Sequence, residues 1–286
     1  MSNAGQAPLT HALTICSTQR NADDVVITAA IRTPLTKGFK GGMKDTPLDY
    51  MIYRTLKELV RRSRIDPQLI EDVCLGNVSL HTTRYLRNVT KSFQVNDPKA
   101  AYTARAASLA AGIPNTSGAN SVNRFCSSGL KAVQDIANQI SCGSIECGIA
   151  IGAESMSTAA GQVSPFHEAI MQHQESVDCM QPMGQTSENV GNDFDISRDS
   201  QDRFAAQSYQ RAEAAQKAGW FDDEIYPFIT KVKDPKTGEE REVTLAKDEG
   251  PRWGTTLESL QKIRPAFPQY GQRSTGGNSS QITDGG

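Results

Sequence analysis

The chain has 286 residues, enough for about two domains. Its 30 Lys and Arg residues nearly balance its 32 Asp and Glu residues, so a net charge of −2 offers no field that would hold nucleic acid or an anionic membrane. No apolar run approaches the roughly 18 residues of a membrane-spanning helix, and the six cysteines include no Cys-x-x-Cys pair. We therefore expect a soluble, globular protein with reduced thiols, no metal site, no nucleic-acid partner and no membrane span.

The first part of the chain predicts strands that alternate with helices. Residues 1–22 are polar and are expected to form a flexible N-terminal or targeting segment. The elements expected after it are strands at 25–30, 72–78 and 147–152, a strand-like segment at 118–123, and helices at 48–60, 100–111 and 126–140. Alternation of this kind is typical of a parallel sheet covered by helices, so we assign residues 23–157 to one α/β core domain.

From about residue 157 the pattern changes. Helices are expected at 187–193 and 197–217, with Ser197 as the N-cap and Gly219 as the stop signal. A pair of strands is expected within 225–245, around a turn that begins at Asp234. The sequence thus predicts a second, α+β domain.

Cys126 is the strongest candidate for a reactive residue. It lies where a strand-like segment meets the start of a helix, and the unpaired N–H groups and dipole of a helix N-terminus favour an anion such as a thiolate. The small residues Ser127, Ser128 and Gly129 leave room for a substrate oxyanion to approach the backbone. The alternative interpretation of this position is a buried structural cysteine.

Residues 123–133, Asn-Arg-Phe-Cys-Ser-Ser-Gly-Leu-Lys-Ala-Val, resemble the nucleophile motif of the thiolases. Residues 152–156, Gly-Ala-Glu-Ser-Met, follow the third strand as they do in that family. Residues 182–190 resemble the peroxisomal type of 3-ketoacyl-CoA thiolase, and residues 264–267 and 274–285 resemble the family's segment that returns from its loop domain. Four motifs in the same order make the resemblance specific.

The resemblance implies an α/β, thiolase-like fold, of which the chain holds only the N-terminal half. This half would consist of a mixed sheet covered by helices, with an inserted α+β loop domain. The loop domain would span 158–270 and bind CoA, and 271–286 would be a truncated return segment. By matching motifs, the expected CoA contacts are Arg252, Ser259, Phe267, Ser280 and Met183. The implied substrates are coenzyme A and acyl-CoA, with no permanently bound cofactor, and the complete family member is expected to be a homodimer or another homo-oligomer.

The reaction implied is thiolytic cleavage of a 3-ketoacyl-CoA to acetyl-CoA and a shortened acyl-CoA in fatty-acid β-oxidation, through an acyl group on Cys126. The family's activating histidine lies in a Gly-His-Pro block of a second core domain, and its proton-transferring second cysteine lies there too. The sequence contains no Gly-His-Pro block, so we expect this chain to be inactive as it stands. Two alternatives remain open: an acetoacetyl-CoA thiolase, and a non-catalytic half that binds CoA or a full-length subunit.

Residues 79–94 depart from the family's pattern. They are basic, lack periodicity and stand where the family has a short loop, so we interpret them as an anomalous insertion that arises from an error in the gene model; the alternative is a genuine disordered insertion. A peroxisomal location is the family's expectation. Only part of its N-terminal address is present, around His11, which leaves a mitochondrial or cytoplasmic location as the alternative.

Overall fold

The computed structural model describes residue 21 and residues 23–78, 99–158 and 166–286. Its centre is a parallel sheet in which β2 (Asp72–Gly76) lies between β3 (Gly118–Val122) and β4 (Gly148–Gly152). Helices α1 (Leu48–Ser63) and α2 (Lys99–Ala110) pack together beside this sheet, and α3 (Ser128–Ser141) packs on β2 and β4. The parallel sheet and these three helices confirm the α/β architecture expected for the core.

Alternate side chains of β2 pack on opposite faces of the sheet. Val73 and Leu75 are fully buried in the cluster that includes α1 and α2, whereas Cys74 is fully buried against Ala132 and Ile136 of α3. This division follows from the two-residue period of a strand, and it explains why β2 is apolar from Val73 to Leu75.

The strand predicted at 25–30 is wrong. The structure forms no strand there, and Val26 and Ile27 are 69% and 76% exposed. An apolar, β-branched run becomes a strand only when a neighbouring strand offers the other half of a hydrogen-bonded ladder, and the described residues bring none to it.

The apolar side chains of α3 do not all face the sheet. Ile136 and Ala132 are buried, whereas Leu130 is 73% and Val133 40% exposed. The side of the helix that carries Ala132 and Ile136 therefore packs on the sheet, in one cluster with Cys74 of β2.

A second, antiparallel sheet joins distant parts of the chain. It consists of β1 (Thr36–Lys37), β8 (Thr283–Gly285) and β5 (Glu154–Ser155), with β8 in the middle. The Asp284 carboxylate accepts hydrogen bonds from the backbone N–H and the hydroxyl of Ser157, which fixes the return of the chain to the core.

The remaining elements confirm the α+β character of the second region. They are α4 (Glu168–Met171), α5 (Gln174–Asp178), α6 (Met183–Asp193), α7 (Arg198–Lys217), α8 (Leu257–Gln261) and the hairpin of β6 (Phe228–Lys233) and β7 (Glu240–Leu245). No helix within the described ranges is both long and apolar enough to cross a membrane. The anomalous stretch 79–94 lies outside the described residues.

The β6–β7 hairpin packs on the core rather than on the helices that precede it. Tyr226 and Phe228 are buried with Met43 and Met51, and the hydroxyls of Thr46 and Thr230 are 2.7 Å apart. The hairpin, which the sequence places in the loop domain, is therefore anchored to α1.

Candidate active site

Three glycines allow α3 to approach the sheet closely. A β-carbon on Gly76 would lie 2.3 Å from the Ser128 carbonyl oxygen, so only glycine fits at the end of β2. A β-carbon on Gly152 would lie 3.0 Å from the α-carbon of Gly129. The start of α3 is thus pressed against the carboxyl ends of β2 and β4.

Cys126 lies in a tight bend between β3 and α3. Phe125 has a positive φ of 50°, a left-handed conformation that costs energy for a bulky residue. The Ser128 hydroxyl accepts a hydrogen bond from the Arg124 N–H at 2.9 Å and donates one to the Phe125 carbonyl at 2.6 Å. The first helical residue is Ser128, so the cysteine stands two residues before the helix.

Asn123 ties this bend to the neighbouring strand. Its side-chain carbonyl accepts a hydrogen bond from the Phe125 N–H at 3.0 Å, and its amide donates to the Val78 carbonyl, just beyond β2, at 3.2 Å. The carboxyl ends of parallel strands are where ligands bind in open α/β sheets, and Cys126 is exposed at that edge.

Two backbone N–H groups of the bend donate hydrogen bonds to carbonyl groups of the same bend. The N–H of Ser127 donates to the Arg124 carbonyl at 3.2 Å, and the N–H of Ser128 donates to the Phe125 carbonyl at 3.0 Å. These two groups are therefore not open donors for a substrate oxyanion. In the part of the chain that the structure describes, no histidine is hydrogen-bonded to the Cys126 thiol. His167 caps α4 by accepting from the Ala169 N–H, and His173 precedes α5.

The other cysteines have different surroundings. Burial raises the pKa of Cys74 to about 11, which keeps this thiol neutral in the core. The pKa of Cys142, just after α3, is lowered by hydrogen bonds with Ser144, whereas burial raises the pKa of Cys147. The described residues hold no cluster of His, Cys, Asp and Glu that could bind a metal ion.

Met183 and Phe267 lie near each other, because the Phe267 ring contacts Gly184, the residue that follows Met183. A β-carbon on Gly184 would lie 2.6 Å from the Phe267 ring, so the ring rests directly on the first turn of α6. Met183, the preceding residue, is 76% exposed. The structure therefore brings these two predicted CoA contacts together on one surface, although they are far apart in sequence.

Ser280 and Arg252 lie on adjoining loops. A β-carbon on Gly250 would lie 3.3 Å from the Gln281 side-chain amide, which links the loop before α8 to the segment before β8. Ser280 and Arg252 are both exposed, and the Ser280 hydroxyl makes only a long contact, 3.5 Å, with the Gln281 carbonyl.

Ser259 has a local role in the structure. It forms a capping box with Thr256, accepting from the Thr256 N–H at 3.1 Å and donating to the Thr256 carbonyl at 2.7 Å. Its hydroxyl proton is thus used to start α8, and a ligand would meet Ser259 only as an acceptor or after this box opens.

Two buried carboxylates fix the segment that carries Ser280. Glu188 of α6 is fully buried and accepts hydrogen bonds from the N–H groups of Arg273 at 3.0 Å and Ser274 at 2.6 Å. Asp202 of α7, also fully buried, accepts from the Asn278 amide at 2.9 Å. Neither role could be predicted from the sequence, because Arg273, Ser274 and Asn278 lie more than seventy positions from the carboxylate that each contacts.

Comparison with known proteins shows which protein family has this fold and this site. The model of the thiolase N-terminal domain matches residues 25–286. The chain belongs to the thiolase family. It is 46% identical over 273 residues to peroxisomal 3-ketoacyl-CoA thiolase A of Candida tropicalis, an alignment that covers 93% of the chain and 61% of that relative. With the peroxisomal thiolase of Saccharomyces cerevisiae it shares 42% identity over 275 residues.

Solved thiolases have the same fold. The dimeric peroxisomal thiolase of Saccharomyces cerevisiae superposes with a TM-score of 0.77 at 42% identity, over 93% of this chain and 64% of that one. The acetyl-CoA acetyltransferase of Bacillus anthracis superposes with a TM-score of 0.71 at 31% identity, over 92% and 63% of the two chains. The predicted family and the thiolase-like α/β fold are confirmed, and the chain spans about 61% of the length of the curated relatives it matches.

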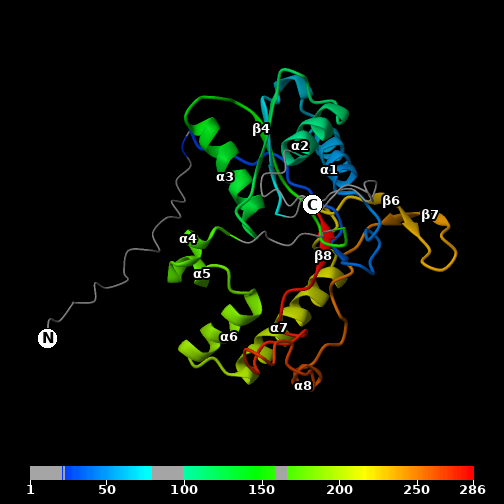
Figure 1. The fold of residues 1–286 in the computed structure, drawn as a ribbon. Coiled ribbons are helices and arrows are strands. Elements are labelled where there is room, and N and C mark those ends of the chain that lie inside the picture. Colours follow the sequence, from blue (N-terminus) through cyan, green and yellow to red (C-terminus); the bar gives the residue numbers. More distant parts are fainter. Residues whose placement is uncertain (1–20, 22, 79–98, 159–165) are drawn as a thin grey trace.

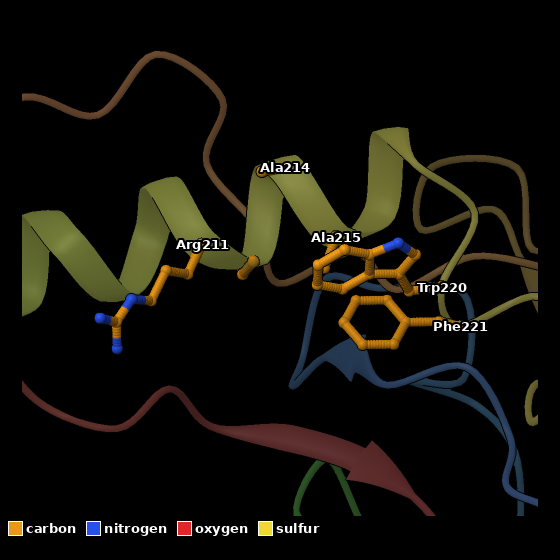
Figure 2. Close-up of a pocket in the computed structure, with 6 residues that line it drawn as sticks. Arg211, Ala214, Ala215, Trp220 and Phe221 are labelled. Carbon is orange, nitrogen blue, oxygen red and sulfur yellow. The ribbon is translucent and has the colours of Figure 1, made fainter.

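An open groove of about 500 Å³ lies beside α7 and was not predicted from the sequence. Its lining includes Arg211, Ala215, Trp220 and Phe221, and none of the residues predicted for the thiolase site takes part. Figure 2 shows the Trp220 and Phe221 rings at one end of the groove and the Arg211 side chain at the other. The sequence feature that indicates this groove is the aromatic pair directly after Gly219, at the end of α7. The sequence alone does not distinguish such a pair from core residues.

Proposed function

We propose that the protein acts as a 3-ketoacyl-CoA thiolase of fatty-acid β-oxidation, in which Cys126 is the nucleophile. The bend that presents Cys126 at the carboxyl edge of the sheet carries this proposal, because it exposes one thiol while hydrogen bonds from Asn123 and Ser128 hold the backbone around it. Relatives that match nearly the whole chain are named 3-ketoacyl-CoA thiolases.

In the proposed cleavage, the Cys126 thiolate attacks the 3-keto carbon of the substrate. The bond between the α- and β-carbons then breaks, its electrons form the enolate of acetyl-CoA, and a proton donor converts the enolate to acetyl-CoA. The thiol of a second CoA gives up its proton and attacks the thioester on Cys126, which releases the shortened acyl-CoA and restores the cysteine.

The two N–H groups that follow Cys126 donate within the bend, so the donors for the enolate oxygen have to lie outside residues 127–128. The proposed CoA surface consists of Met183, Phe267, Ser280, Arg252 and Ser259. Glu188 and Asp202 act as positioning residues, because they hold Ser274 and Asn278 of the return segment, which precede Ser280 in the chain.

The test is cleavage of 3-ketoacyl-CoA thioesters by the protein purified from its source, with CoA as co-substrate. The proposal predicts release of acetyl-CoA and loss of that activity in Cys126→Ala, with Cys179→Ala as the control for another exposed cysteine. Equal activity in both variants would refute the role of Cys126. A preference for acetoacetyl-CoA over longer substrates would favour the acetoacetyl-CoA thiolase alternative.

We further propose that the 286-residue chain alone binds CoA but does not turn over substrate. In the described residues no histidine is bonded to Cys126, and the sequence holds no Gly-His-Pro block. Thiolysis by the purified chain would contradict this. The exposure of Val26, Ile27 and Leu130 supports the second candidate function, a half that pairs with further thiolase surface, and a complex with a full-length subunit in sedimentation would support it.

Location and assembly follow from the same proposal. We propose a peroxisomal protein that acts as a homodimer, since relatives with more than 40% identity are named peroxisomal and a superposed structure is described as dimeric. Fluorescence microscopy of the tagged protein together with a peroxisomal marker tests the location.

A further inference from the structure

Glu154 lies where the two sheets of the core meet. It follows β4 after a single residue and opens β5, where it is paired with Gly285 of β8. The residue between the two strands, Ala153, donates its N–H to the Gly76 carbonyl at 3.1 Å. Glu154 therefore stands directly beside the carboxyl end of β2.

The Glu154 carboxylate holds the chain where it leaves β2. Its Oε2 accepts hydrogen bonds from the Val78 N–H at 3.0 Å and from the Asn77 side-chain amide at 3.3 Å. Asn77 is only 3% exposed, and its amide also donates to the Ala153 carbonyl at 2.8 Å. Water competes little with buried hydrogen bonds of this kind, so they fix residues 77 and 78 firmly.

Val78 connects this carboxylate to the bend that carries Cys126. The Val78 carbonyl accepts from the Asn123 side-chain amide at 3.2 Å, and the Asn123 side-chain carbonyl accepts from the Phe125 N–H at 3.0 Å. Both polar backbone groups of Val78 are thus bonded, the N–H to Glu154 and the carbonyl to Asn123. A left-handed Phe125, with a φ of 50°, persists only where its surroundings hold it in that conformation.

We propose that Glu154 is a positioning residue for the Cys126 thiol and acts through Val78 and Asn123. The carboxylate fixes Val78, on which Asn123 rests, and Asn123 in turn fixes the backbone directly before the cysteine. The inference rests on the proposed function for its effect on catalysis, because a nucleophile has to be held in one direction. The pairing with Gly285 extends the same connection to the return segment.

Glu71 provides a matched control at the opposite end of β2. Its carboxylate accepts hydrogen bonds from the N–H groups of Glu146 and Cys147, which precede β4. Because β2 and β4 are parallel, Glu71 joins these strands at their amino ends, whereas Glu154 joins them at the carboxyl ends, beside Cys126. A mere loss of stability would appear in both Glu71→Ala and Glu154→Ala.

The first experiment measures amide hydrogen exchange in the 286-residue chain by NMR and needs no catalytic activity. In Glu154→Ala, the Phe125 N–H is expected to exchange roughly tenfold faster relative to the Cys74 N–H in β2, the factor for one lost hydrogen bond to a charged group. Glu154→Gln, which keeps an oxygen acceptor for Val78, should stay close to the parent. An unchanged ratio in Glu154→Ala, or the same rise in Glu71→Ala, would refute the inference.

The second experiment measures thiolysis of a 3-ketoacyl-CoA by variants of the protein produced in its source. Glu154→Ala is expected to lower kcat roughly 10- to 100-fold with little change in the KM for CoA, because the thiol is misdirected while the CoA surface is intact. Glu154→Gln should recover most of the kcat, and Glu71→Ala should keep it. Glu154→Asp, which withdraws the carboxylate from Val78 by one methylene group, is measured in the same way if Glu154→Ala does not fold.

A double variant tests the route through Asn123. In an Asn123→Ala background, Glu154→Ala should lower kcat no further, whereas independent effects would multiply. Multiplied losses, or full kcat in Glu154→Ala alone, would refute the inference while the proposed function stands. Absence of thiolysis by the parent protein would refute the proposed function instead, and hydrogen exchange at Phe125 would then decide whether Glu154 holds the bend.

Discussion

The end of β2 touches the start of α3 at Gly76 and Ser128, where a β-carbon on the glycine would fall 2.3 Å from the serine carbonyl oxygen. Neither residue can move aside easily, because the atoms that would clash with the β-carbon are backbone atoms of α3. Since Ser128 also holds Arg124 and Phe125, the close approach at Gly76 sets the position of the bend that carries Cys126.

Gly76→Ala is expected to destabilise the protein by about 1–3 kcal/mol or more, because the added methyl group forces α3 away from the sheet. The control is Gly276→Ala, since no atom lies within 4 Å of a β-carbon built there. That variant should stay within about 0.5 kcal/mol of the parent. Urea denaturation measures both, and equal midpoints would show that the contact at Gly76 does not constrain the fold.

Glu188→Ala removes the acceptor for two backbone N–H groups and leaves Arg273 without its buried carboxylate, whose Oε2 lies 3.7 Å from Arg273 Nη1. We expect a loss of about 3–5 kcal/mol. Glu188→Gln keeps one acceptor and should lose less, and Glu175→Ala, at an exposed position of α5, should change little. Urea denaturation compares the three variants, and a higher midpoint for Glu188→Ala than for Glu188→Gln would contradict this account.

Asp284 should give the stability of the protein a characteristic pH dependence. Burial raises the pKa of this carboxyl above its ordinary value of 3.8, although hydrogen bonds from Ser157 act in the opposite direction. The folded state then keeps the proton at pH values where the unfolded state has lost it. The free energy of unfolding contributed by Asp284 therefore falls as pH rises from about 3.8 through the pKa of the folded state.

Asp284→Asn does not titrate, so the stability of the parent relative to this variant should decrease across that window and stay level above it. Denaturation at a series of pH values measures the difference. A difference that grows with pH would mean that the pKa of Asp284 is lowered in the folded state, contrary to the prediction.

The thiols should differ in their rates of alkylation. Iodoacetamide at neutral pH is expected to spare Cys74, whose pKa is about 11, until the protein unfolds. Cys142 should lose reactivity severalfold in Ser144→Ala, because that serine lowers the pKa of its thiol, whereas Ser141→Ala should leave the rate unchanged. Cys126 should react no faster than an ordinary exposed thiol. Peptide mapping measures each site, and rapid labelling of native Cys74 would contradict its burial.

Local signals in the sequence predicted local structure well. Ser197 caps α7 by accepting from the Ser200 N–H at 3.1 Å, and the Asp234 carboxylate accepts from the N–H groups of Lys236 and Thr237 in the predicted turn. These features depend on residues within four positions of one another. The run at 25–30 carried an equally clear pattern and failed, because a strand depends on a partner elsewhere.

In the candidate site, too, only features built from residues close together in the sequence could be predicted. The position of Cys126 before a helix could be predicted, since the bend is built from residues 123–128. The contact of Gly184 with Phe267 and the burial of Glu188 against residues 273–274 could not, because each joins segments more than eighty residues apart. Only the family resemblance named Met183 and Phe267 as expected contacts of the same ligand.

The central claim is that CoA binds with its thiol end at Cys126, and thiol–disulfide exchange with CoA disulfide tests it directly in the 286-residue chain. The Cys126 thiolate attacks one sulfur of the disulfide, forms a mixed disulfide with CoA and releases one CoA thiolate. Peptide mapping would compare Cys126, Cys142 and Cys179, the three exposed cysteines of the described residues, with glutathione disulfide as the reference reagent. We predict that CoA disulfide modifies Cys126 preferentially and with saturation, and that Arg252→Ala removes the preference. The same relative rates at the three cysteines for both reagents would contradict the claim.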